Sequence, residues 1–221
     1  MLDAVPVHLV ARRGGEIRER GVVVAAGPGD AIDLAWSERP ADARLAVLAA
    51  ARFPDGGDYL SEINPAAEAL VQAVGRRLKS GAMLLIDYGF PAAEYYHPQR
   101  SAGTVMCHYR HHARDDPFAW PGLTDITAHV DFSAIAAAGV RAGLHVAGYA
   151  PQAPFLLGCG LLDMLAAVGA PDSLAYIKAA APVQKLLSPA EMGELFKVLA
   201  LARSDGIAWP GFALGDRSHR L

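Results

Sequence analysis

The clearest hydrophobic pattern in the chain is a continuous apolar run at Ala82–Ile86, which leads into Asp87, Tyr88 and Gly89. The run shows no alternation of apolar and polar side chains. Strands that are buried on both faces have this pattern, and they are typical of parallel sheets in α/β domains. We therefore predict a buried parallel strand that delivers Asp87 to its carboxyl end.

A helix is predicted just before this strand. Asn64 suits the N-cap, Pro65 suits the first helical position, and Gly81 favours termination at the other end. Apolar residues recur at positions 67, 70, 71, 74 and 78, which fall on one face of a helix.

Two more apolar runs predict strands at Gly143–Tyr149 and Phe196–Ala202. Capping residues and helical periodicity predict several helices around them. These are expected from Asp131 to about Ala138, at about 152–168, at about 173–187, and after the capping box Ser188-Pro189-Ala190-Glu191.

The first part of the chain has a different pattern. Residues 5–12 and 19–24 are rich in strand-forming residues and flank Arg13-Gly14-Gly15-Glu16, which is typical of a β-hairpin. A short helix is expected at Ala41–Arg52. Gly27-Pro28-Gly29 lacks the third glycine of a nucleotide-binding loop, so we interpret it as a plain turn.

The alternation of helices and strands predicts an α/β, Rossmann-like domain with three layers. Ligands of open parallel sheets bind beyond the carboxyl ends of the strands, which is where Asp87 and the long Phe90–Thr124 excursion begin. An ordinary strand exit remains the alternative for Asp87-Tyr88-Gly89. A loop of this length is usually functional or forms a lid.

Composition excludes several classes of protein. With 221 residues, 52% of them hydrophobic, and a net charge of −3, the chain resembles neither a disordered segment nor a nucleic-acid-binding protein. Its richest apolar stretch, Phe155–Ala170, is shorter than the ~20 residues of a membrane-spanning helix. The two cysteines, Cys107 and Cys159, lie far apart, so we expect a reducing compartment without a disulfide framework.

Two polar clusters border the long loop. Cys107-His108-Tyr109-Arg110-His111-His112 is compatible with a transition-metal site, a polar pocket lining or a solvated loop, and we favour the pocket lining. Asp125–Asp131 alternates polar and apolar residues, so an extended conformation would align Asp125, Thr127, His129 and Asp131 on one face. Such a row suits cation binding or proton transfer, while the simpler alternative is a surface strand followed by an N-cap at Asp131. The cluster Tyr95-Tyr96-His97-Pro98 could stack on a ligand or pack the loop.

These clusters resemble the MidA-like family of class I S-adenosylmethionine-dependent methyltransferases, which has a mitochondrial member that methylates protein arginine and assists assembly of respiratory complex I. The matching segments follow the family order over nearly the whole chain. They are Leu84–Phe90, Glu94–Arg100, Cys107–His111, Asp125–Phe132 and Met192–Leu199.

The resemblance implies how the predicted strands are arranged. Ala82–Ile86 resembles the fifth strand of the methyltransferase sheet, Gly143–Tyr149 the sixth, and Phe196–Ala202 an antiparallel seventh strand inserted between them. Residues 1–203 are then part of one domain with insertions at about 5–60, 90–130 and 151–190, and residues 204–221 are expected to form a flexible tail.

The chain departs from the family in one respect. It has neither the glycine-rich donor loop after the first strand nor the acidic ribose-binding residue after the second, and its Leu2–Val7 resembles the segment that follows the fourth strand. We therefore expect this sequence to be the C-terminal half of a family member, either because its start was mis-assigned or because the chain was trimmed. Such a half should bind the methyl donor weakly or not at all, and should be marginally stable or self-associate through its exposed sheet edge.

The resemblance and the positions above imply site residues. Asp87, Asp125 and Asp131 would hold the acceptor guanidinium, with His129 as a proton acceptor. Residues expected to line the acceptor pocket are Tyr88, Gly89, Tyr95, Gln99, His108 and Arg110, and residues expected near the donor are Asp3 and Ala4.

The predicted function is methyl transfer from S-adenosyl-L-methionine to a protein arginine in the bacterial cytoplasm. The expected partner is a protein substrate, with no nucleic acid and no membrane. A non-catalytic module that binds the acceptor protein is the first alternative. A metal site at His108, His111, His112 and His129 is the second.

Overall fold

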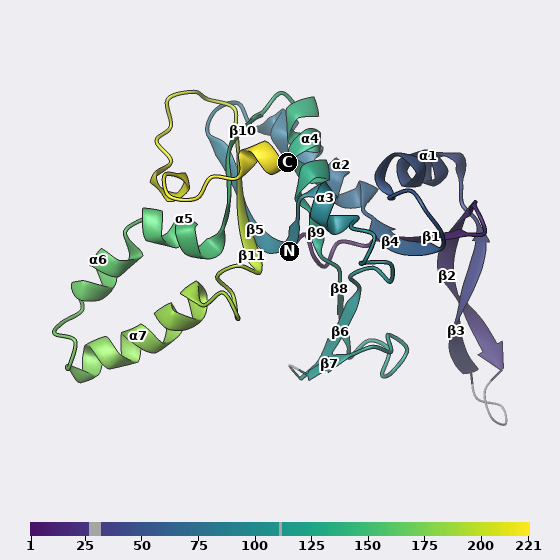
Figure 1. Cartoon of the computed structure of the whole chain (residues 1–221), viewed down its shortest axis with the longest axis horizontal. Coiled ribbons are helices and arrows are strands. Elements are labelled where there is room, and N and C mark those ends of the chain that lie inside the picture. The colour runs from purple at the N-terminus through teal and green to yellow at the C-terminus, as the bar shows by residue number, and fades with distance from the viewer. Residues whose placement is uncertain (27–31, 111) are drawn as a thin grey trace. The chain divides into compact units, whose positions relative to one another are not determined.

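A computed structural model describes residues 1–26, 32–110 and 112–221 (Figure 1). The chain divides into two compact units, where the sequence predicted one domain. Unit 1 contains residues 1–67 and 92–129, and unit 2 contains residues 68–91 and 130–221. The predicted Gly27-Pro28-Gly29 turn lies outside the described residues.

Unit 1 is built on an antiparallel sheet with the strand order β3-β2-β1-β4. Strands β1 (His8–Arg13) and β2 (Glu16–Ala26) form the predicted hairpin, and Gly14 and Gly15 adopt the positive φ angles of 55° and 90° that its tight turn requires. Strands β3 (Ile32–Pro40) and β4 (Tyr59–Ile63) were not predicted.

The short helix expected at residues 41–52 is confirmed as α1 (Ala43–Arg52). Asp42 caps it, because its carboxylate accepts a hydrogen bond from the backbone N–H of Leu45 at 2.8 Å. Leu45 and Ala49 form the buried face of this helix.

The long excursion after Phe90 is partly ordered into secondary structure. It begins with a single turn of helix, α3 (Ala92–Tyr95), and then forms a small antiparallel sheet with the strand order β7-β6-β8. The strands are β6 (Met106–Tyr109), β7 (His112–Arg114) and β8 (Asp125–Thr127).

Unit 2 contains the sheet that the apolar runs predicted, with the strand order β10-β11-β5-β9. Strand β11 (Phe196–Ala202) lies between β5 (Ala82–Phe90) and β10 (His145–Pro151) and is antiparallel to both, as predicted. The short strand β9 (Val130–Asp131) pairs in parallel with the end of β5. Residues 198–202 of β11 are completely buried, so this strand forms the centre of the core.

The environment of β5 differs from the prediction. Leu85 and Asp87 are buried, but the side chains of Leu84 and Ile86 are 45% and 48% exposed, so only one face of the strand is covered. On the edge of β5 that faces away from β11, only Gly89 and Phe90 pair with another strand among the described residues. The continuous apolar run therefore marks a strand with one open face, and its principal neighbour is antiparallel.

Helices of unit 2 agree broadly with the predicted ones. Helix α2 (Pro65–Arg77), which starts in the last residues of unit 1, is capped by Asn64, whose side chain accepts the N–H of Ala67 at 2.9 Å. Asp131 similarly caps α4 (Phe132–Arg141). The remaining helices are α5 (Gln152–Gly158), α6 (Leu161–Ala166) and α7 (Leu174–Leu187).

Two local predictions in this region were wrong. The helical stretch at 152–168 is divided by Gly160, which has a φ of 83°. Ser188 does not start a helix, because its carbonyl accepts the N–H groups of Glu191 and Gly193 and closes a turn before β11 begins.

The tail that was expected to be flexible instead packs on the sheet. It contains two short 3-10 helices, Pro210–Phe212 and Ser218–Arg220. Phe212 is buried against Phe155, with ring centroids 5.0 Å apart, and the backbone N–H of Tyr149 donates to Asp216. Phe212 thus belongs to the core of unit 2 and ties the tail to it.

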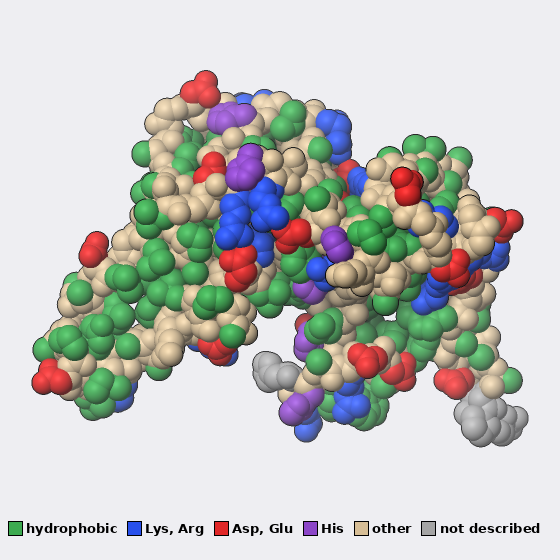
Figure 2. All heavy atoms as spheres, viewed as in Figure 1, with side chains coloured by type: hydrophobic (Ala, Val, Ile, Leu, Met, Phe, Trp, Pro, Cys, Tyr) green, Lys and Arg blue, Asp and Glu red, His purple; other side chains and the backbone are tan. Residues whose placement is uncertain are grey.

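Helices α6 and α7 carry many apolar side chains on the surface (Figure 2). Leu162, Met164, Leu174 and Ile177 are all more than half exposed, and α7 buries none of its residues. Among the described residues, no helix has both the length and the hydropathy needed to cross a bilayer.

Arg203 joins the ends of two helices in unit 2. Its guanidinium donates to the carbonyl oxygens of Leu78 and Gly75, at the end of α2, and to that of Ala142, which follows α4. The distances are 3.0, 2.7 and 2.8 Å. Carbonyls at a helix C-terminus lack partners within the helix, so one side chain satisfies groups from both helices.

We predict that Arg203→Lys lowers the free energy of unfolding by about 1–3 kcal/mol, because an ammonium group cannot reach three carbonyls with the geometry of a guanidinium. Urea denaturation followed by circular dichroism measures this loss. Arg77→Lys, at an exposed position of α2, is the matched control and should change stability by less than about 0.5 kcal/mol. Equal effects of the two substitutions would contradict the assigned role.

Candidate functional site

A buried carboxylate organises unit 1. Glu62 lies on β4, and its side chain is only 2% exposed. Its Oε1 accepts the backbone N–H groups of Thr104 at 2.7 Å and Val105 at 3.0 Å. Its Oε2 accepts the hydroxyls of Thr104 at 3.0 Å and Tyr95 at 3.1 Å. A buried carboxylate needs such a set of donors, and here the donors come from the long excursion.

The same network reaches His129. The hydroxyl oxygen of Tyr95 lies 3.0 Å from the carbonyl oxygen of His129, and the N–H of His129 donates to the hydroxyl oxygen of Thr104 at 3.0 Å. Tyr95 is 2% exposed. The structure thus gives Tyr95 an anchoring position inside the unit, where the sequence predicted a substrate contact.

Sequence reasoning missed Glu62 because β4 itself was not predicted. One signal was present. Glu62 stands two residues before the N-cap Asn64, and its neighbours Ser61 and Ile63 are buried, so an acidic residue at this position requires hydrogen-bond donors. Gly103 supports the same contact. It has a φ of 79°, and a Cβ atom there would lie 2.4 Å from Oε1 of Glu62.

Three predicted site residues lie around one pocket of unit 1. His108 on β6 and Asp125 on β8 are cross-strand partners, so their side chains leave the small sheet on the same face. Together with Arg110 and Leu123 they line an open pocket of about 500 Å³. Arg110 has a φ of 51°, which is unusual for a residue with a side chain. This pocket offers a carboxylate, an imidazole and a guanidinium to a polar ligand.

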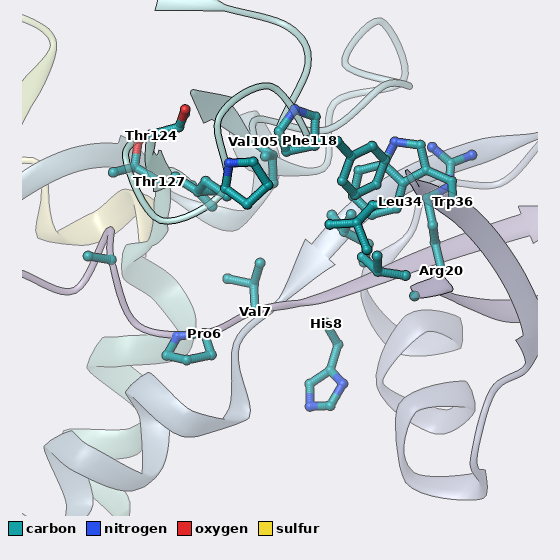
Figure 3. A pocket seen from close by; sticks show the side chains of 18 of the residues that line it. Pro6, Val7, His8, Arg20, Leu34, Trp36, Val105, Phe118, Thr124 and Thr127 are labelled. Carbon is teal, nitrogen blue, oxygen red and sulfur yellow. The ribbon is translucent and has the colours of Figure 1, made fainter. Parts of the chain in front are cut away.

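A larger pocket of about 680 Å³ lies elsewhere in unit 1 (Figure 3). Its walls come from the N-terminal segment 3–9, from the β2–β3 hairpin, and from residues between 105 and 128. The predicted donor-side residues Asp3 and Ala4 belong to the first wall. Most of the lining is apolar.

Glu19 connects the three strands beside this pocket. Its carboxylate accepts a hydrogen bond from Nδ1 of His8 at 2.7 Å and two from the guanidinium of Arg39, at 3.0 and 2.7 Å. These bonds, the one from His8 first, hold the pKa of Glu19 below its ordinary value despite the opposing effect of burial.

In unit 2, Asp87 and its neighbours lie near the end of β5. Asp87 is buried, its Oδ1 accepts the N–H of Tyr88 at 3.0 Å, and its cross-strand partner is the buried Lys197. The ring of Tyr88 packs edge-on against Phe196, with centroids 5.6 Å apart. Gly89 is a packing requirement, since a Cβ atom there would lie 2.1 Å from the carbonyl oxygen of Val130.

The remaining predicted residues are distributed separately. Of the expected row of Asp125, Thr127, His129 and Asp131, the first two lie on β8, which ends at Thr127, and Asp131 in unit 2 accepts the N–H of Ala134 through its Oδ1. Gln99 lines a small pocket of unit 1 with Glu94, His97 and Arg100.

The structure offers no geometry for the metal alternative in the part of the chain that it describes. No three of the described His, Cys, Asp and Glu residues come close enough together to hold an ion. His111, one of the four histidines considered, lies outside the described residues. Cys107 is buried and Cys159 is exposed, and both are free thiols.

Comparison with known proteins now places these features. A family model described as "putative S-adenosyl-L-methionine-dependent methyltransferase" matches residues 1–150. The chain belongs to this methyltransferase family. The match includes the complete Glu62 network, the polar pocket at His108 and Asp125, and the segment Asp87–Gly89.

Relatives and solved structures agree with the family. The chain is 29% identical over 210 residues to the protein arginine methyltransferase NDUFAF7 homolog of Drosophila melanogaster, and 32% identical over 148 residues to protein arginine methyltransferase NDUFAF7 of Mus musculus, both mitochondrial. Two crystal structures of superfamily members from Burkholderia thailandensis cover all of it at 51% and 50% identity, each with a TM-score of 0.92. The second of these is bound to S-adenosyl-homocysteine.

The methyltransferase relatives are longer than this chain. The alignments cover 90% and 63% of the chain but only 45% and 31% of the Drosophila and mouse proteins. The chain covers 58% and 56% of the two Burkholderia structures. It thus spans about half the length of the relatives that it matches.

We predict that Glu62→Ala lowers the free energy of unfolding by about 3 kcal/mol or more, because it removes the acceptor of two backbone N–H groups and of the Thr104 hydroxyl inside unit 1. Glu62→Gln should cost about 1 kcal/mol, since the amide oxygen can still accept the N–H groups. Urea denaturation measures both, and Glu16→Ala, at an exposed position, is the control. Similar small losses for Glu62→Ala and Glu16→Ala would contradict the role of the network.

A second prediction concerns pH. The pKa of Glu19 is lower in the folded chain than its ordinary value of 4.5, so the ionised carboxylate stabilises the fold above that value, and this contribution is lost as the pH falls through the folded pKa. The stability difference between the wild type and Glu19→Gln should therefore be present at about pH 5.5 and shrink between about pH 4.5 and 3. Unfolding curves across this range check the trend, and a pH-independent difference would refute it.

Proposed function

We propose that this chain is the acceptor-side part of an S-adenosyl-L-methionine-dependent enzyme that methylates arginine in a protein substrate. The observation that carries the proposal is the match, over the entire chain and at 50% identity, to a structure bound to S-adenosyl-homocysteine. The names of the Drosophila and mouse relatives support arginine as the acceptor.

The chemistry explains why carboxylates matter. When bound, S-adenosyl-L-methionine supplies an electrophilic methyl group on a sulfonium. A guanidinium is cationic and a poor nucleophile, so the protein must orient one of its nitrogens and accept the proton that leaves. Carboxylates hold a guanidinium through paired, charge-assisted hydrogen bonds and raise the electron density on the reacting nitrogen.

Each unit offers candidates for this work. In unit 1, Asp125 would hold the guanidinium, with His108 and Arg110 lining the same pocket and His129 as a proton acceptor. In unit 2, Asp87 is a buried carboxylate at the family motif, next to Tyr88 and Gly89. Asp131 already accepts a backbone N–H as the N-cap of α4, which favours a structural role for it.

The described residues provide only part of a binding site for the methyl donor. Asp3 and Ala4 form one wall of the large pocket, where a carboxylate beside apolar side chains suits a cationic sulfonium. The glycine-rich loop and the acidic ribose-binding residue of the family are absent from the sequence. We therefore propose weak donor binding by the 221-residue chain alone, and stronger binding when the rest of a family member is present.

The experiment places this chain in the Burkholderia protein in place of the segment that it matches, and supplies labelled S-adenosyl-L-methionine and an arginine peptide. We expect methylarginine, and we expect Asp87→Asn and Asp125→Asn each to lower kcat by about 10-fold or more, because an amide cannot hold a guanidinium as a carboxylate does. Asp55→Asn, at an exposed position, should leave kcat within about 2-fold.

The outcomes separate the parts of the proposal. Normal turnover in both aspartate variants would overturn the residue roles. Binding of S-adenosyl-homocysteine without methylation of arginine would overturn the acceptor. Binding of an acceptor protein without donor binding would favour the non-catalytic module.

A further inference from the structure

The large pocket of unit 1 has an apolar interior that is open to solvent. In Figure 3, Val7, Leu34, Trp36, Val105 and Phe118 surround the cavity from three different segments. Its volume of about 680 Å³ falls in the range of pockets that bind small ligands or several side chains of a peptide, and is too large for one side chain.

One wall is an aromatic pair. The rings of Trp36 on β3 and Phe118 in the loop between β7 and β8 have centroids 4.8 Å apart with a tilt of 56°. Trp36 is still 41% exposed, and its cross-strand partner Val22 and Ile126, which also lines the pocket, are about half exposed. Apolar side chains that line a pocket and remain exposed together are typical of a binding surface.

Negative charge lies beside this wall. Asp115 and Asp116 closely precede Phe118, both are exposed, and Oδ1 of Asp116 accepts the N–H of Phe118 at 2.9 Å, so the two carboxylates form an acidic rim next to the aromatic pair. The cation in the lining, Arg20, is already paired with Glu38 through bonds of 3.1 and 2.8 Å. The acidic rim also affects the neighbouring strand: burial raises the pKa of the Cys107 thiol, and the charges of Asp116 and Asp115 raise it further.

The two properties together define a ligand. An apolar cavity with aromatic walls suits an aromatic or large aliphatic side chain. An acidic rim attracts cationic groups and disfavours acidic ones. A peptide segment in which an apolar residue stands beside arginine meets both requirements, whereas an acidic peptide or an anionic lipid meets neither.

We propose that this pocket binds several residues of the protein substrate, including the apolar residue adjacent to the target arginine, with the acidic rim holding the cationic side chains of the same segment. The inference rests on the proposed function and makes Trp36 and Phe118 determinants of sequence specificity. Because Asp3 and Ala4 also line this pocket, a segment bound here would lie next to the residues proposed to contact the donor.

Binding of short synthetic peptides to the 221-residue chain, measured by calorimetry, tests this directly. A peptide that contains phenylalanine next to arginine should bind about 10-fold more tightly than one with serine in place of phenylalanine. Replacing the arginine by glutamate should also weaken binding by about 10-fold, and the loss should decrease as salt is added.

Variants locate the site. Trp36→Ala should weaken binding of the phenylalanine–arginine peptide by about 10-fold and abolish the preference over serine, and Trp36→Phe should restore most of both. Val23→Ala is the matched control, because Val23 lies on the same hairpin but its side chain leaves the opposite face from Val22 and Trp36. Its affinity should stay within about 2-fold of the wild type, and circular dichroism confirms that each variant is folded.

The possible results are distinct. Equal binding of the phenylalanine and serine peptides, or an unchanged affinity in Trp36→Ala, overturns the inference even if the Burkholderia chimera methylates arginine. Selective peptide binding that depends on Trp36, without methyl transfer in the chimera, supports the pocket and overturns the proposed function. Affinity that depends on protein concentration would show that a second copy of the chain occupies the pocket, which also overturns the inference.

Discussion

The carboxylate of Glu62 is the interaction on which unit 1 depends. A charged group without water is tolerated only when its lone pairs are satisfied, and each of its donors lies in the excursion that follows β5. The buried carboxylate on β4 therefore favours the conformation of residues 95–105 that brings these donors to it. The backbone of His129 is held by Thr104 and Tyr95 of the same network, so Glu62 also fixes the chain shortly after β8.

Unit 2 uses a different principle. Its core is the strand β11, whose residues 198–202 are all apolar and completely buried, and backbone groups at its borders are closely matched to their partners. Arg203 satisfies the carbonyls at two helix ends, and Gly89 allows β9 to approach β5 closely. In unit 1 a charge selects a loop conformation, whereas in unit 2 close packing selects the strand order. Each unit contains some of the segments that resemble the methyltransferase family.

Most of the fold in unit 2 could be predicted from sequence, since apolar runs and capping residues are local signals. Phe196–Ala202 and the caps at Asn64 and Asp131 are examples. The open face of β5 could not be predicted, because the residues Leu84 and Ile86 are apolar whether or not anything covers them. Ser188 carries a valid capping signal, but the turn that precedes β11 leaves no room for a helix.

The candidate site was predictable only in part, for a related reason. His108 and Asp125 were recognised as polar residues beside one loop, and the antiparallel register of β6 and β8 makes them neighbours. The large pocket was not predicted, since it depends on Trp36 and Phe118, which are far apart in sequence and lie in segments without a local pattern. Long-range pairing of this kind leaves no periodic trace in a single sequence.

The interleaving of the two units has a consequence for biosynthesis. Unit 1 is completed only when residues 92–129 have been made, after the ribosome has already produced β5 of unit 2. The apolar segment Leu84–Ile86 must then wait until β11, about 110 residues later in the chain, has been made before it gains its principal neighbour. During that interval a nascent chain exposes an aggregation-prone strand, so a chaperone that recognises short apolar segments would be most useful after unit 1 has closed and before β11 emerges.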